Sequence, residues 1–376
     1  MSRGGLPPGR GRGKGSRLSS AHQDVATGAA QDGLSDAVML TNRRAECDMS
    51  TESLRPWRKW AVLCPPDAAA SVCPLVDIGA NTQTWGDSKF WAELVRAGSA
   101  GVGAIVLTGT NAKKVASAAE RVEQSVQVRN LVLATHSQGA SEPRSAEMRT
   151  IIAQLRALAS STPGWQLPRL FYTAGVHPHE AKHATDADFS MFETLLQTDA
   201  ACVAVGECGL DYDRMFSPRE TQIDVFQQHI RLALKHGKSL FIHERDKDAD
   251  KGLPLGSFID MLRCIDDEVC LTSGLDPRRV CVHCWTGPEH QLTELVRRGY
   301  MIGLTGFICM RKRGAHLREA IQTGLIPLEQ IMVETDAPYM RGDADYYPTS
   351  IESRILQPPT VTPRSTAPVV SGVTKG

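Results

Sequence analysis

The sequence predicts an α/β fold in which eight parallel strands and their connecting helices close into a (β/α)8 TIM barrel. Three observations lead to this prediction: eight short β-type runs recur from Leu75 onward, helix-like segments separate most of them, and the runs are almost continuously apolar. Strands that alternate with helices belong to parallel sheets, and continuous apolar runs are typical of strands buried on both faces. Eight such units between residues 71 and 347 fit a closed barrel better than an open sheet.

The predicted strands are short aliphatic and aromatic runs with polar or glycine-containing borders. They are Leu75–Ile78, Ala104–Thr108, Leu170–Ala174, Cys202–Gly206, Ser239–His243, Val280–His283, Met301–Thr305 and Ile331–Thr335. The predicted helices repeat their apolar residues at helical spacing, as Ile223, Phe226, Ile230 and Leu234 do. They are Lys89–Ala97, Asn111–Ser125, Asp186–Gln197, Pro218–His236, Leu255–Cys264, Pro288–Arg298 and Ala315–Thr323.

Two regions interrupt this alternation. Residues 131–169 are longer than a barrel connection needs, and we interpret them as an insertion that carries a helix over Ala146–Ala159. From Pro338 the chain is rich in Pro, Thr and Ser, and Ile351–Leu356 is too short to cover a barrel strand. We therefore predict an irregular tail over residues 348–376, and the sequence leaves open how the last strand closes the barrel.

The first 70 residues differ from the rest in composition. Five basic residues and no acid lie between Met1 and Arg17, and a polar segment rich in Ala, Gly and Ser follows. Such a segment buries too little apolar surface to offset its chain entropy, so we predict a disordered basic and polar extension. A transit peptide or a nucleic-acid-binding arm is the alternative interpretation. The predicted location is the cytoplasm, with the nucleus and the mitochondrion as alternatives.

Composition limits the possible partners. The 42 Lys and Arg residues balance 42 Asp and Glu residues, so no global field draws the chain to a polyanion, and such a substrate needs a local cationic site. No apolar run approaches the roughly 18 residues that cross a bilayer, and we expect no membrane partner. The ten cysteines form no dense framework, and we expect most to be reduced and buried. The C-x-x-C at Cys281–Cys284 is interpreted as structural rather than as a redox or zinc motif.

Polar side chains occupy the C-terminal ends of the predicted strands, the edge at which a barrel forms its active site. Histidine, glutamate and aspartate converge there from distant parts of the sequence, which chance alone explains poorly. The residues are Asp77 with Asn81, Thr108, His177 with His179, Glu207, His243, His283, Thr305 and Asp336. Imidazole and carboxylate ligands suit Mg²⁺, Mn²⁺ or Zn²⁺, and a divalent cation there would favour phosphoryl chemistry.

Seven phrases in this order resemble the TatD family of metal-dependent deoxyribonucleases, relatives of the amidohydrolase barrels. The resemblance covers about residues 75–347, and the seven phrases together are specific where one alone is not. They are Asp77-Ile-Gly-Ala-Asn81, Gly175-Val-His-Pro-His179, Gly206-Glu-Cys-Gly-Leu-Asp211, Phe241-Ile-His-Glu-Arg245, His283-Cys-Trp-Thr-Gly287, Gly303-Leu-Thr-Gly306 and Glu334-Thr-Asp-Ala-Pro-Tyr339. The family implies a divalent-metal DNase, Mg²⁺ first, with exonuclease-type processing of DNA the usual expectation.

The resemblance also implies roles for individual residues. Glu207 matches a bridging or principal metal ligand with a catalytic role, and His243 and His283 match imidazole ligands. Asp336 matches the last-strand ligand and general base. His177 matches a histidine that contacts substrate phosphate or supports the site, and His179 matches either a substrate contact or a loop-structuring residue.

One departure concerns the first strand, where many relatives carry His-x-His to complete a second metal site. This chain has Gly79 and Asn81 there. Glycine has no ligand atom, and asparagine has only a neutral oxygen, which leaves Asn81 as a substrate contact. We therefore predict one firm metal site from Glu207, His243 and His283, and a second site that is weak or filled only when substrate phosphate is present.

Cationic side chains follow two of the predicted strands. Arg245 comes after the fifth strand, and Arg311, Lys312 and Arg313 form a basic loop after the seventh. We expect them to contact the DNA backbone without reading its sequence, and a solvated charge run is the alternative.

Two other functions stay open at this point. A hydrolase of the same barrel type that acts on an amide, lactone or phosphotriester would share these ligands. An inactive DNA-binding or scaffold relative is the other alternative, because Gly79 and Asn81 depart from the pattern. The sequence leaves the oligomeric state, DNA against RNA, and exonuclease against endonuclease action undecided.

Overall fold

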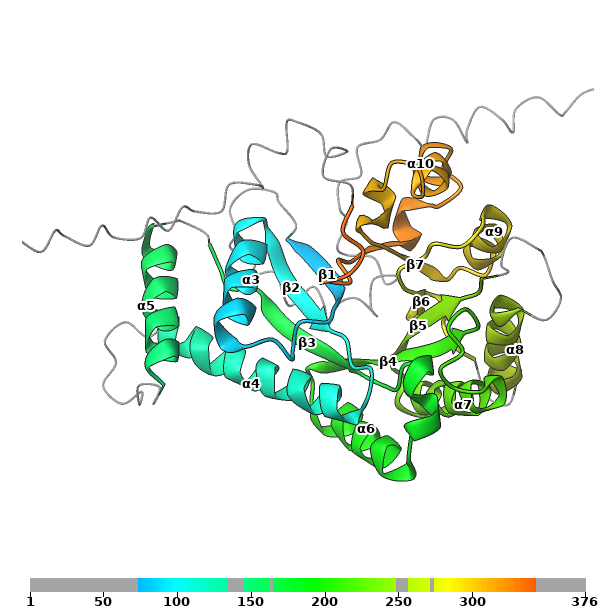
Figure 1. The fold of residues 1–376 in the computed structure, drawn as a ribbon, viewed down its shortest axis with the longest axis horizontal. Coiled ribbons are helices and arrows are strands. Elements are labelled where there is room, and N and C mark those ends of the chain that lie inside the picture. The colour runs from blue at the N-terminus through cyan, green and yellow to red at the C-terminus, as the bar shows by residue number, and fades with distance from the viewer. Residues whose placement is uncertain (1–73, 134–144, 162–164, 248–255, 271–273, 343–376) are drawn as a thin grey trace, which may run out of the picture. The chain divides into compact units, whose positions relative to one another are not determined.

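The computed structural model describes residues 74–133, 145–161, 165–247, 256–270 and 274–342. Its eight strands pair side by side in sequence order from β1 to β8, and every ladder is parallel (Figure 1). The predicted TIM-barrel architecture is thus confirmed. The strands are β1 (Leu75–Ala80), β2 (Val102–Leu107), β3 (Arg169–Ala174), β4 (Cys202–Asp211), β5 (Ser239–Arg245), β6 (Val280–Val282), β7 (Met301–Leu304) and β8 (Ile331–Val333).

Helices lie outside the strands and cover them (Figure 1). Two of them, α4 and α5, stand between β2 and β3, where the other connections use one. The helices are α3 (Asp87–Ser99), α4 (Ala112–Leu133), α5 (Ala146–Ser161), α6 (Asp186–Thr198), α7 (Arg219–His236), α8 (Ser257–Cys270), α9 (Glu289–Arg297) and α10 (Ala315–Gln322), with short 3-10 turns at η2 (Pro178–His183), η4 (Pro277–Arg279), η5 (Gly306–Cys309) and η6 (Leu328–Gln330).

The core lies between the strands and these helices. Helix α7 shows how the sequence forms it, since Phe226, Ile230 and Ala233 lie on one stripe of the helix and are completely buried. The helix ends at Gly237, whose left-handed conformation (φ 56°) is one that glycine adopts without steric cost. Burying an aromatic or aliphatic side chain of this kind contributes about 1.5–3 kcal/mol.

Two elements extend beyond their predicted ends. Helix α4 continues to Leu133 because its far end still buries Val128, and α4 contacts α5. Strand β4 continues past Gly206 to Asp211, because it stays paired with β5 as far as the Asp211–Arg245 register, with an irregularity between Gly206 and Cys208. The extension matters for the site, since Glu207 and Asp211 then belong to one strand.

The last strand closes the barrel through polar contacts at its C-terminal end rather than through a long ladder. Ala80 and Ala337 form an isolated parallel bridge. The Asp336 N–H donates to the Gly79 carbonyl at 2.8 Å, and the Asp77 carboxylate accepts from the backbone N–H (2.9 Å) and the hydroxyl (2.6 Å) of Thr335. The connection between β8 and β1 therefore depends on a buried carboxylate and one threonine.

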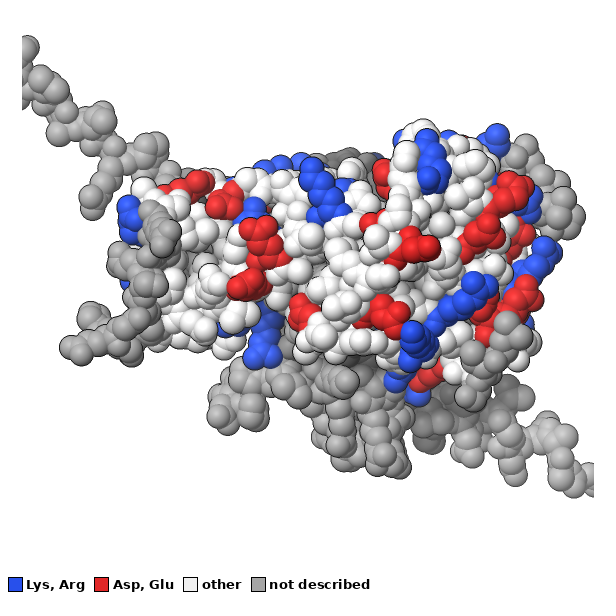
Figure 2. Space-filling view, turned by 90° about the horizontal axis from the view of Figure 1, so that it is seen from below, with Lys and Arg blue, Asp and Glu red and all other residues white. Residues whose placement is uncertain are grey.

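Charges of both signs are interspersed among the described residues on the face drawn in Figure 2, as the balanced composition leads one to expect. In the part of the chain that the structure describes, none of the helices combines the length and apolarity needed to cross a membrane. The predicted extension over residues 1–70 and the predicted tail over residues 348–376 lie outside the described residues, and the predicted location of the protein stays a prediction.

Replacing Thr335 by Val should lower the free energy of unfolding by about 1 kcal/mol, because the Asp77 carboxylate loses its hydroxyl donor. Burial raises the pKa of Asp77 to about 6, and the hydrogen bonds from Thr335 limit that rise. The pKa of Asp77 is above its unfolded value, so wild-type stability falls as the pH rises towards 6. Thr335→Val raises the pKa of Asp77 further. The substitution should therefore lower the free energy of unfolding more above pH 6 than below it. Urea unfolding at about pH 5 and pH 8 measures this, with Thr335→Ser as the control; an equal cost at both pH values would contradict it.

Candidate metal centre

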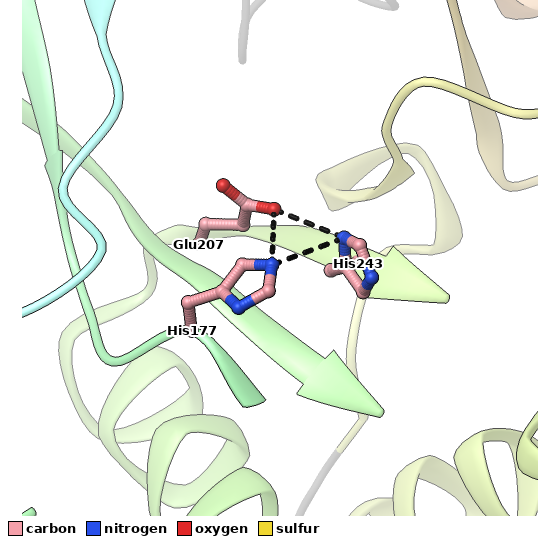
Figure 3. Close-up of side chains that lie close together, drawn as sticks. All are labelled: His177, Glu207 and His243. Atoms are coloured by element: carbon pink, nitrogen blue, oxygen red, sulfur yellow. Dashed lines mark hydrogen bonds and ion pairs between the residues drawn. The ribbon is translucent and has the colours of Figure 1, made fainter. Parts of the chain in front are cut away.

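Three imidazole rings converge on one oxygen of Glu207. The Glu207 carboxylate comes from β4 and is buried, and Figure 3 shows His177 and His243 turned towards it. Its Oε1 lies 3.2 Å from His177 Nε2, 3.1 Å from His243 Nδ1 and 2.9 Å from His283 Nε2. A single carboxylate oxygen thus faces three nitrogens that each can donate a hydrogen bond or a lone pair.

The parallel strands explain how residues so distant in sequence meet. His243 lies in β5, His283 follows β6 directly, and His177 lies in the loop just after β3. The carboxyl ends of parallel strands share one edge of the barrel, so side chains there point into a common space. His177 is also the residue at which η2 begins, and its Nδ1 accepts the backbone N–H of His179 at 3.1 Å.

Two further carboxylates lie beside the ring nitrogens of His243 and His283 that point away from Glu207. The Nε2 of His243 lies 3.1 Å from Asp211 Oδ2, and the Nδ1 of His283 lies 3.4 Å from Glu334 Oε2. A carboxylate on the outer nitrogen keeps the proton there and leaves the inner nitrogen with a lone pair, the arrangement seen around metal-binding histidines. Each of these rings thus lies between two carboxylates, and a cation beside Glu207 would take the inner nitrogen of each in place of a proton.

In His177 the hydrogen bonds place the proton on the nitrogen that faces Glu207. Because its Nδ1 accepts a backbone N–H, the neutral ring carries its proton on Nε2, the atom that faces Glu207. The ligand atoms of His177, Glu207 and His243 lie within 4.8 Å of one another, a spacing that suits a metal ion. The hydrogen bonds nonetheless favour His177 as a donor and His283 as the second imidazole ligand.

The pKa values in the metal-free site follow from burial and from these contacts. Burial alone would raise the pKa of Glu207, but His283 and His177 outweigh it and hold that pKa well below the usual range. Burial would lower the pKa of His283, but Glu207 and Glu334 outweigh it and raise that pKa well above 6.5. Burial lowers the pKa of His177 to about 4, which keeps its ring neutral at physiological pH.

Asp336 stands on the wall of the same pocket. Its Oδ1 accepts a hydrogen bond from the Asn81 amide at 2.8 Å. Burial raises the pKa of Asp336 to about 7, with His283 opposing the rise and Glu207 adding to it. A carboxylate with a pKa near 7 is suited to accept a proton at neutral pH.

Two of the predicted substrate contacts are engaged with Asp211. The ring Nε2 of His179 lies 2.7 Å from Asp211 Oδ2, and the Arg245 guanidinium donates to the same oxygen at 2.6 Å. Asp211 is completely buried, and His243, the backbone N–H of Arg214 and Arg245 together hold the pKa of its carboxyl below the usual range despite burial. His179 and Arg245 line the pocket and at the same time hold the carboxylate that orients His243.

The pocket around the centre has a volume of about 510 Å³. Besides the residues above, Lys114, Arg214 and Arg313 bring positive charge to it, and Phe216 and Tyr339 bring aromatic rings. Of the predicted basic loop, Arg313 lines the pocket, whereas Arg311 and Lys312 are exposed and are not among its lining residues.

Several of these residues were missed by the sequence analysis. Asp211 and Glu334 lie in the phrases that it quoted, yet it gave them no role. A signal was available: side chains two or four residues apart on a strand share a face, so Asp211 follows Glu207. Lys114, Arg214 and Tyr339 reach the pocket from loops and a helix start, and no periodicity marks such positions.

The donor set fits a divalent cation. A carboxylate and two neutral imidazole nitrogens are the ligands that Mn²⁺, Zn²⁺ and, less readily, Mg²⁺ accept. His243 Nδ1 and His283 Nε2 lie 3.1 and 2.9 Å from the same oxygen of Glu207, on the side where a cation could meet all three residues. Glu207, His243 and His283 are the residues that would hold it.

Comparison with known proteins identifies relatives of this chain. The family model described as "TatD related DNase" matches residues 76–361. The 3'-5' ssDNA/RNA exonuclease TatD of Pectobacterium carotovorum is 32% identical over 269 residues, which cover 71% of this chain and 80% of that protein. The protein of the same name from Pectobacterium atrosepticum is 32% identical over 268 residues, with the same coverage. The fold is shared with a TatD family hydrolase from Entamoeba histolytica at a TM-score of 0.51 and 21% identity, covering 72% of this chain and 76% of that one.

Metal affinity should increase with pH through neutrality. The raised pKa of His283 keeps its ring protonated in the metal-free protein, and a cation must displace that proton to reach the lone pair. Calorimetric titration with Mn²⁺ at about pH 6, 7 and 8, in two buffers with different ionisation enthalpies, should show proton release that diminishes as the pH rises. Binding without proton release at the lowest pH would contradict this description of the site.

Proposed function

Because the chain belongs to the TatD-related DNase family, we propose that it is a metal-dependent nuclease that hydrolyses phosphodiester bonds of single-stranded DNA. The observation that carries the proposal is the meeting of Glu207, His243 and His283 with Asp336 in one pocket that basic side chains also line. The curated relatives are named as 3'-5' single-strand exonucleases, which supports exonuclease-type processing here.

We assign the metal to one principal site formed by Glu207, His243 and His283. A divalent cation bound there supplies charge for the phosphoryl oxygens and acidity for a water molecule. Mg²⁺ is the proposed ion, with Mn²⁺ and Zn²⁺ as alternatives that the two imidazoles also suit. Asp336 faces the place of a second ion, which we propose binds weakly because Gly79 has no ligand atom.

Asp336 is the proposed general base and a metal ligand when substrate is present. Asn81 holds one oxygen of Asp336, and the pKa of about 7 lets the carboxylate accept a proton at neutral pH. Asn81 itself lines the pocket and has its carbonyl oxygen available for the substrate. The Nε2–H of His177 is placed to donate to a phosphate oxygen.

The pocket suits a flexible strand with exposed bases. We propose that Lys114, Arg214 and Arg313 contact phosphates, with His179 and Arg245 beside them and Arg311 and Lys312 further along the strand. Phe216 and Tyr339 are 52% and 61% exposed although they are large rings. Exposed aromatic rings beside basic side chains are the kind of surface on which unpaired bases stack, and a paired duplex cannot use them.

Replacing Glu207 by Gln should abolish metal-dependent release of nucleotides from single-stranded DNA. Gln keeps the shape of Glu207 but removes the charge that the ligand histidines face, so we expect a larger loss than the roughly 10–100-fold that follows removal of an outer partner. The measurement follows mononucleotides from a labelled oligonucleotide with Mg²⁺ and with a chelator.

The matched control is Glu180→Gln, because Glu180 lines the same pocket and its hydrogen bond to the His177 carbonyl comes from its backbone N–H, which glutamine keeps. Equal activity of Glu207→Gln and wild type would mean that a contaminating nuclease is measured. Wild type that binds DNA but releases nothing would favour the inactive relative, and activity towards an amide or phosphotriester alone would favour the other hydrolases. The position of the label distinguishes attack from the 3' end from attack from the 5' end. An RNA oligonucleotide of the same sequence shows whether the enzyme prefers DNA or RNA.

The salt dependence of DNA binding should identify the phosphate contacts. Lys114→Gln should reduce the slope of log affinity against log salt by about 0.7, the value for one phosphate contact on a single strand. The control is Lys113→Gln, an exposed neighbour on α4 that does not line the pocket. Arg313→Gln should behave like Lys114→Gln; unchanged slopes in both variants would place the strand elsewhere.

A further inference from the structure

A completely buried histidine of α7, His229, has both ring nitrogens engaged with the backbone and takes no part in the proposed reaction. Its Nε2 accepts the backbone N–H of Val176 at 3.0 Å, and its Nδ1 donates to the Val225 carbonyl at 2.7 Å. A backbone N–H only donates and a carbonyl only accepts, so these partners fix a neutral ring with its proton on Nδ1. Burial lowers the pKa of His229 to about 4, which agrees with a neutral ring.

The Val176 N–H lies just beyond the end of the sheet. The register between β3 and β4 ends at Ala174, so the next backbone N–H groups find partners outside the ladder. The Val176 N–H donates to His229, and the His177 N–H donates to the Thr110 carbonyl at 2.9 Å. The backbone that carries His177 is therefore anchored from two sides, once by α7 and once by the segment after β2.

The same segment packs directly against the strand that carries Glu207. A Cβ atom on Gly175 would lie 2.6 Å from the carbonyl carbon of Gly206, so no side chain fits between the two backbones. The Nε2 of His177 lies 3.2 Å from Glu207 Oε1. Because Gly175 and His177 are two residues apart, a shift of this segment moves the imidazole relative to the carboxylate.

We propose that His229 is a positioning residue, whose hydrogen bond to Val176 holds His177 where its Nε2–H can reach a substrate phosphate. The inference rests on the proposed function, in which His177 is that donor. His229 is not among the residues that line the pocket, and its ring contacts the backbone next to His177 rather than His177 itself. Its influence on the site therefore passes through the backbone of residues 175–177.

A purely structural role is the competing explanation. The His229 ring packs against two rings of α6, with its centroid 4.8 Å from that of Phe189 and 6.4 Å from that of Phe192. On this explanation the ring only fills the space between α6 and α7. Each substitution would then lower stability according to the packing lost, and none would act through His177. The test must separate the two hydrogen bonds of the ring and follow the position of His177.

Asparagine and glutamine each keep one of the two hydrogen bonds. Asparagine places its amide where Nδ1 lies, so it keeps a donor for Val225 but does not reach the Val176 N–H. Glutamine places its amide oxygen where Nε2 lies, so it keeps the acceptor for Val176. We expect His229→Asn to lower kcat for Mg²⁺-dependent cleavage of single-stranded DNA by up to about 100-fold, the effect of a displacement of about 1 Å. His229→Gln should retain kcat.

A double-mutant cycle shows whether this loss passes through His177. In a His177→Gln background the acceptor at position 229 should no longer matter, so His229→Asn should cause less than about a twofold further loss. A loss of equal size in both backgrounds would overturn the proposal. The matched control is His236→Asn, the same substitution in the last turn of α7, where the ring contacts Glu193. A comparable loss of kcat in this control would favour the structural explanation.

Crystal structures of the metal-free wild type and both variants test the geometry independently of activity. We expect His177 Nε2 to move by more than about 0.5 Å relative to Glu207 in His229→Asn, and to stay in place in His229→Gln. A ring that keeps its place in His229→Asn would overturn the proposal. If His229→Asn does not fold, His229→Met replaces it in every comparison, because methionine fills the space between the two rings of α6 without an acceptor for Val176.

Failure of the proposed nuclease function would give a different result from failure of this inference. A wild-type protein that cleaves no nucleic acid, but in which His229→Asn displaces His177, would refute the function and leave the positioning role standing. An active nuclease whose His177 stays in place in His229→Asn would refute the positioning role alone.

Discussion

Burial of the Glu207 carboxylate is the constraint on which the site depends. A charge of that kind costs several kcal/mol to remove from water unless its surroundings compensate it. Here three imidazole nitrogens within 3.2 Å of one oxygen provide the compensation in the absence of a cation. Each comes from a different barrel strand, so the barrel must form before the charge is satisfied. Fold and site are therefore stabilised together.

The three histidines around this carboxylate are not equivalent, and the difference comes from their outer partners. Asp211 holds the outer nitrogen of His243 and Glu334 that of His283, through Nε2 in one ring and Nδ1 in the other. His177 has a backbone N–H as its partner instead, which reverses its role. Identical residue types thus differ in which ring nitrogen faces Glu207, because each ring has a different hydrogen-bond partner on its other side.

The chain as a whole is neutral, but the same edge of the barrel carries basic side chains that a polyanionic substrate could contact. Over the whole sequence the charges cancel, and the face drawn in Figure 2 mixes both signs. At the pocket, Lys114, Arg214 and Arg313 contribute positive charge from loops and from the start of α4. Under the proposed function these basic side chains would contact a phosphate backbone locally, without giving the protein a general affinity for anions.

The sequence by itself determined the barrel and the ligand types, because strand and helix periods and the strand-end rule are local properties. It located all eight strands and identified Glu207, His243, His283 and Asp336 as the residues to examine. Only the tertiary structure decided which nitrogen of each histidine faces inward, since Asp211 and Glu334 act through space on residues 32 and 51 positions away.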